Sequence, residues 1–127
     1  MTEATTALRR AGLIHLLMLV GRTVLTFGFA GLIFSEPGAE DYLYLFLGVG
    51  FVISASGTAL AAVLLLVGAR RVLDDQRTVA WVGVVIGVLW PAMHLLLSLV
   101  AFMPWFVPMQ LVCLGFTAWA GAKLRAS

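Results

Sequence analysis

The sequence predicts an all-α integral membrane protein, a bundle of four transmembrane helices with both termini in the cytoplasm. Two observations exclude a soluble fold: hydrophobic residues make up 62% of the chain and charged residues only 11%, with a mean hydropathy of +1.07. Soluble domains average roughly 45–50% apolar and 25% charged residues. A third observation is that the polar connections are short, so we expect one domain over residues 1–127.

Four apolar segments are each long enough to cross the hydrocarbon core, which takes about 20 helical residues. We expect transmembrane helices at about 11–34, 42–69, 78–101 and 105–123. The last two must be separate helices, because the uncharged stretch 78–122 would otherwise form one helix about 67 Å long. Pro104 and Pro108 mark the turn, since proline lacks a backbone donor. Pro108 leaves open a shorter fourth segment that lies at the interface or re-enters the membrane.

Basic residues predict the orientation of these helices. The bases outside the apolar segments all fall on one side of the membrane in this topology: Arg9, Arg10, Arg70, Arg71, Arg77, Lys123 and Arg125. The opposite connections are the acidic segment 35–41 and the uncharged proline turn. Because cytoplasmic loops carry an excess of Lys and Arg, we expect a multi-pass protein of the cell or inner membrane with both termini inside. The preference for arginine over lysine favours a bacterial source.

Arg22 is the most informative residue, because none of the four apolar segments contains an acidic side chain that could neutralise it. A cation within the membrane usually faces protein, water or an anion. At 1.5 Å per residue, Arg22, His94 and Gln110 each lie about 20–22 Å above the cytoplasmic boundary. Three helices therefore contribute to one polar layer, which could surround an anion or receive a carboxylate from a partner subunit.

Each residue of this layer also has a structural interpretation. The long side chain of Arg22 could bring its head group outward to lipid phosphates or to the acidic segment 35–41. His94, with Ser98 one turn later, could be a neutral histidine hydrogen-bonded between helices, and Gln110 could serve the same purpose. The sequence leaves these alternatives open.

His15 lies seven residues before Arg22 on the same helical face, so we expect that face to pack against protein. Two histidines also raise the question of haem, which would need both imidazoles at one level. His15 is only about 9 Å above the cytoplasmic boundary and His94 about 20 Å, which argues against joint ligation. No Cys, Asp or Glu lies beside either histidine, so we expect neither a metal site nor a cofactor.

Small residues at four-residue spacing predict the packing between helices. Such ridges let helix backbones approach closely. They comprise Gly83 and Gly87 in the third segment and Gly50, Ser54 and Thr58 in the second. We expect contacts within the chain rather than a dimer face, because a four-helix unit needs such surfaces for itself.

The sequence contains no G-x-S-x-G, H-E-x-x-H or phosphate-loop motif, so we assign no catalytic residues and favour a non-enzymatic protein over a small lipid-modifying enzyme. The first hypothesis is an accessory or scaffold subunit that packs against larger membrane partners, one of which neutralises Arg22. The alternative is a small homo-oligomeric transporter or channel for an anion or an anionic lipid-like substrate. Expected partners are membrane lipids and other membrane subunits or further copies of the chain, and not nucleic acid.

Overall fold

The computed structural model describes residues 2–33, 49–100 and 107–127, with side chains described for 2–28, 49–97 and 107–127. The regular elements in this part of the chain are helices: α1 (Glu3–Ile33), α3 (Phe51–Val72), α4 (Thr78–Val100) and α5 (Val107–Ala126). The expected all-helical class is therefore confirmed for the described residues.

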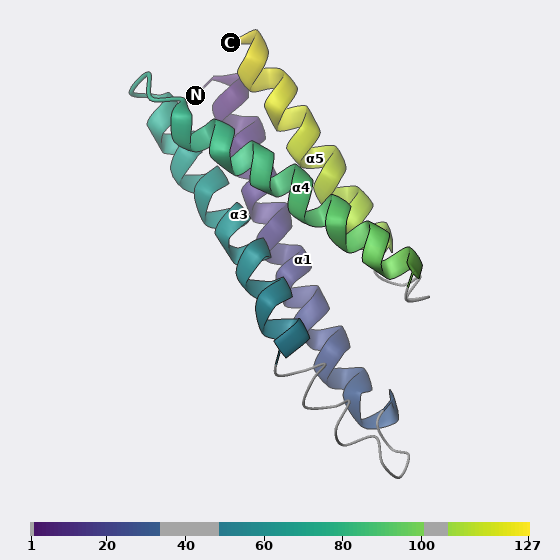
Figure 1. Cartoon of the computed structure of the whole chain (residues 1–127). Helices are drawn as coiled ribbons and strands as arrows, with labels where there is room; N and C mark the ends of the chain where they lie inside the picture. Colours follow the sequence, from purple (N-terminus) through teal and green to yellow (C-terminus); the bar gives the residue numbers. More distant parts are fainter. Residues whose placement is uncertain (1, 34–48, 101–106) are drawn as a thin grey trace.

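The helices form an antiparallel ring (Figure 1). α1 packs against α3 and α5, and α4 packs against the same two helices, so α1 and α4 lie diagonally across the bundle. Both chain ends and the turn between α3 and α4 lie at one end of the bundle (Figure 1). The seven bases that predicted the orientation therefore belong to helix ends and a turn that gather at this same end.

The helix bounds differ from the expected segments mainly at the end that carries the termini. α1 begins at Glu3 instead of residue 11, because Ala4, Ala7 and Leu8 are buried although Arg9 and Arg10 interrupt the hydropathy. α3 continues to Val72, which is also buried. Of the second expected segment, residues 42–48 lie outside the described part of the chain. These extensions arise because helix packing continues beyond the purely apolar stretch.

Hydropathy separates α5 from the other helices. Three helical stretches are long and apolar enough to cross a membrane: Glu3–Gly28, Phe51–Val72 and Thr78–Leu97. α5 is not among them, because Gln110, Thr117 and two bases in its last turn lower its hydropathy. The expected four spans are thus supported for three helices. α5 nevertheless packs along both α1 and α4 as the fourth member of the ring.

The interior contains small residues near the chain ends, while large apolar side chains point outward. The buried core there is rich in alanine, including Ala7, Ala69 and Ala120. Leu17 and Val24 on α1 and Leu89 on α4 are each more than 60% exposed, at 61%, 65% and 64%. Lipid tails can cover such side chains as well as a protein core does, so this distribution fits a bundle surrounded by membrane.

Glycines bring α3 and α4 close together. A Cβ on Gly68 would meet the backbone of Ala80, and one on Gly83 would lie within 3.0 Å of the Leu64 carbonyl carbon. Gly83 thus packs within the chain, as its spacing predicts. Gly50, in contrast, is exposed at the start of α3.

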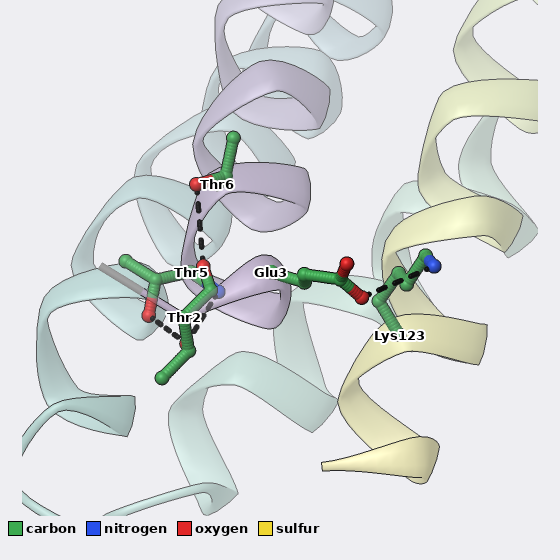
Figure 2. Close-up of polar contacts among 5 residues, drawn as sticks. All are labelled: Thr2, Glu3, Thr5, Thr6 and Lys123. Carbon is green, nitrogen blue, oxygen red and sulfur yellow. Dashed lines mark hydrogen bonds and ion pairs between the residues drawn. The ribbon is translucent and has the colours of Figure 1, made fainter.

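Polar contacts at the end that carries the termini cap the start of α1 and join it to α5 (Figure 2). The hydroxyl of Thr2 accepts the backbone N–H of Thr5 at 3.1 Å, which caps the first turn of α1. Glu3 pairs with Lys123 of α5 at 3.3 Å. Because the Glu3 side chain is 83% exposed and that of Lys123 is 37% exposed, this ion pair contributes at most about 1 kcal/mol.

Candidate functional site

The guanidinium of Arg22 points into the bundle. Arg22 lies on α1 and is only 7% exposed. Its Nη2 donates to Oγ1 of Thr58 at 2.8 Å and to the Ser54 carbonyl at 3.2 Å, both on α3. In this structure the head group therefore contacts α3 and does not reach outward. The acidic segment 35–41, the other outward partner, lies outside the described residues.

The Ser54 carbonyl is a centre of this polar cluster. It accepts the Thr58 hydroxyl at 3.1 Å and the indole N–H of Trp90 at 3.1 Å, in addition to Arg22. Since the Thr58 proton is used on this carbonyl, the oxygen lone pairs of Thr58 are free to accept from Arg22. The cation is thus solvated by neutral oxygen dipoles from α3.

His94 is held by its own helix. Its Nδ1 lies 2.9 Å from the Trp90 carbonyl, and because a carbonyl can only accept, Nδ1 carries the proton in this contact. The imidazole also lies against the Trp90 indole, with 5.1 Å between ring centroids. Ser98 follows on α4, but its side chain lies outside those that the structure describes. We expected His94 to bond a neighbouring helix. Its hydrogen bond in the structure is instead within α4.

His15 joins α1 to α5 and is fully buried, at 0% exposure. Its Nε2 lies 2.8 Å from Oγ1 of Thr117, which in turn bonds the Cys113 carbonyl at 2.7 Å. Gly87 of α4 faces this pair, and a Cβ there would lie 2.9 Å from the Thr117 methyl group. Gly87 therefore packs within the chain, and the face shared by His15 and Arg22 is buried, as the sequence predicts.

Contacts between helices set the register of the site. His15, Gly87 and Thr117 meet at one level of the bundle. Seven residues from each, toward the end away from the termini, lie Arg22 on α1, His94 on α4 and Gln110 on α5. Seven residues are nearly two turns, so each helix presents the same face about 10.5 Å further along. The fold thus brings the three residues of the predicted layer to one level.

Two more observations support this register. A Cβ on Gly21 would lie 3.1 Å from the Met109 methyl group, one residue from both Arg22 and Gln110. Gln110 itself is buried, at 6% exposure. No hydrogen bond joins Arg22 to His94 or Gln110 among the described contacts, so the layer is a shared level rather than a connected network.

The site therefore has two levels along α1, one at His15 and one at Arg22. Helical spacing predicted the buried face of His15. It did not predict that Thr117 contacts His15 or that Trp90 contacts Ser54. Thr117 could have been found, because it lies seven residues after Gln110 on the same face of α5. Trp90 could not, since its contact with Ser54 depends on how α3 and α4 are rotated against each other.

The geometry limits what the site can hold. The two histidines are about 10.5 Å apart along the axis, which does not suit one haem between them. In the described ranges, no three His, Cys, Asp or Glu side chains cluster as metal ligands would. The described acids are Glu3, Asp74 and Asp75, all at the end that carries the termini. A fixed cation without a nearby described acid is suited to binding an anion.

Comparison of the chain with models of known protein families, with curated proteins and with solved structures found no match.

Proposed function

We propose that this chain is a small, non-enzymatic integral membrane protein that transports or conducts an anion, with Arg22 as the residue that attracts it. The observation that carries the proposal is the burial of the Arg22 guanidinium at one level with an imidazole and an amide. Neutral dipoles from α3 solvate the cation, and a bound anion would supply the negative charge that no described residue provides near Arg22. An anionic lipid-like molecule is an alternative substrate, because its negative charge would bind Arg22 in the same way.

Four membrane-crossing helices and cytoplasmic termini belong to this proposal. The ring arrangement supports a crossing α5, because α5 runs beside α4 and packs against α1 from Glu3, which pairs with Lys123, to Gly21, which lies at Met109 (Figure 1). The bases gathered at the end of the bundle that carries the termini support a cytoplasmic location for that end. The protein would then lie in the cell or inner membrane.

The accessory-subunit hypothesis receives less support from the geometry. It relied on a partner's carboxylate reaching Arg22, and this side chain is enclosed by its own bundle. A partner could still pack against the apolar exterior. Purification in several mild detergents, followed by mass spectrometry, tests this idea, and recovery of the chain only as a monomer or homo-oligomer would remove it.

Anion flux in liposomes tests the transport proposal. Vesicles that contain the purified protein should pass at least one of chloride, phosphate or a small carboxylate faster than empty vesicles, and Arg22→Ala should abolish this flux. Arg125→Ala is the matched control, because Arg125 is exposed at the end of α5 and should be dispensable. If wild type and Arg22→Ala are equally silent for all these anions, the proposal loses its basis.

A further inference from the structure

Two buried nitrogen atoms of the site have no hydrogen-bond partner in the structure: Nδ1 of His15 and Nε of Arg22. Buried polar atoms in proteins are nearly always paired, and leaving one unpaired costs free energy. Both atoms belong to side chains that are more than nine-tenths buried. Two such atoms on one face of α1 therefore point to a molecule between them.

The hydrogen bonds of Thr117 decide which nitrogen of His15 carries the proton. The Thr117 hydroxyl has one hydrogen, which it donates to the Cys113 carbonyl at 2.7 Å. Its oxygen must therefore accept from Nε2–H of His15, 2.8 Å away. In a neutral imidazole the other nitrogen is then an acceptor. Nδ1 of His15 thus needs a donor, whereas the Nε–H of Arg22 needs an acceptor.

The Arg22 head group extends toward the level of His15. α3 runs antiparallel to α1, so Thr58, which accepts from Nη2, lies one turn nearer to the His15 level than Ser54 does. Helical side chains lean toward the N-terminus of their helix, and the Arg22 side chain, which is longer than that of His15, extends further in this direction. The backbone separation of about 10.5 Å between positions 15 and 22 is therefore reduced at the side-chain ends.

We propose that the site selects an oxyanion that retains one acidic hydrogen, such as hydrogencarbonate, bound between Arg22 and His15. One oxygen of the anion accepts from the Nε–H of Arg22, and its hydroxyl donates to Nδ1 of His15. A halide, nitrate or an ionised carboxylate can satisfy only Arg22, because it has no hydrogen to donate. This inference names the substrate class of the proposed function and rests on it.

Hydrogencarbonate and nitrate make a matched pair of probes, because both are planar monoanions and only the first has a hydroxyl group. The apparent affinity of each for the purified protein follows from the rise of the thermal unfolding midpoint with anion concentration. Wild type should bind hydrogencarbonate about tenfold more tightly than nitrate, as one additional buried hydrogen bond predicts. This comparison needs no variant.

His15→Gln isolates the acceptor. A glutamine amide can still donate to Thr117 from the position of Nε2, but it has no atom at the position of Nδ1. We expect the preference for hydrogencarbonate to disappear in this variant while nitrate binding is unchanged. Arg22→Ala should abolish binding of both anions.

Three outcomes separate the two proposals. Equal affinities of wild type for the two anions would overturn the selectivity and leave a water molecule between Arg22 and His15, while anion binding through Arg22 would stand. A preference that survives in His15→Gln would also overturn it. Anion responses that are absent, or that persist in Arg22→Ala, would remove the proposed function itself.

Discussion

The indole of Trp90 lies directly on Gly57, so that a methyl group at position 57 would overlap the ring. This contact lets α3 and α4 approach closely enough for the indole N–H to reach the Ser54 carbonyl at 3.1 Å. The same carbonyl accepts from Arg22. The absence of a side chain at one position thus determines how a tryptophan on α4 and an arginine on α1 share one acceptor on α3.

We expect Gly57→Ala to destabilise the bundle by about 1–3 kcal/mol, because the added methyl group must displace the Trp90 ring. Thermal unfolding in detergent measures the effect. Gly115→Ala is the control: Gly115 is also within a helix, but a Cβ there would meet no atom within 4 Å. The control should leave stability unchanged or raise it by up to about 1 kcal/mol, because alanine favours a helix more than glycine does. Equal effects of the two substitutions would contradict the close contact.

Thr117→Val should destabilise the protein by about 1–2 kcal/mol more than Thr23→Val. Both hydroxyls donate to the carbonyl four residues earlier, Thr117 to Cys113 at 2.7 Å and Thr23 to Leu19 at 2.8 Å. Only Thr117 also accepts from the buried His15, which would be left without a partner. Chemical or thermal unfolding of the two variants compares them, and matching losses would mean that the contact with His15 contributes nothing.

Arg22→Lys should retain only part of the anion flux of wild type, with a loss of about tenfold. An ammonium group lacks the planar arrangement of donors with which Arg22 bonds Thr58 and Ser54 and still offers Nε–H. Arg22→Leu should lose the flux completely. The same two variants are compared by thermal stability. Full activity of the Lys variant together with a stabilised Leu variant would mean that the arginine extends outward to lipid in the membrane.

Cysteine cross-linking tests the register of α1 against α5. In a Cys113→Ala background, cysteines at positions 22 and 110 should cross-link, because Gly21 and Met109 make contact at that level. Cysteines at positions 22 and 117 lie about two turns apart and should not. Gel mobility after oxidation with a copper catalyst reports both pairs. If the 22–117 pair cross-links and the 22–110 pair does not, Arg22 and Gln110 do not lie at one level.

The orientation is tested by labelling single cysteines from each side of the membrane, again in the Cys113→Ala background. A cysteine at Gly38 should label only from outside and one at Asp74 only from inside, because the flanking bases lie on the side of Asp74. Asp74 is a better position than Asp75, whose backbone has a φ of 60° that a cysteine adopts less readily. Labelling of both from the same side would exclude the four-span topology.

Composition and spacing predicted much of the architecture. Long apolar segments predicted helices 78–101 and 105–123 close to the observed α4 and α5, because a membrane or a helical core requires the backbone to satisfy its own hydrogen bonds. Helical periodicity predicted that His15 and Arg22 share a buried face. The start of α1 was missed, because Arg9 and Arg10 interrupt the hydropathy, although Ala4, Ala7 and Leu8 before them are buried in the bundle.

The sequence by itself determined the class of the protein, the helical faces and the presence of a cation without an acidic neighbour. Only the tertiary structure decided where that cation points and what it contacts. Periodicity determines which residues of one helix lie together, but the rotation and offset between helices arise from side-chain packing, such as Trp90 against Gly57. For this reason the bonds of Arg22 to Thr58 and of His15 to Thr117 could not be read from spacing alone.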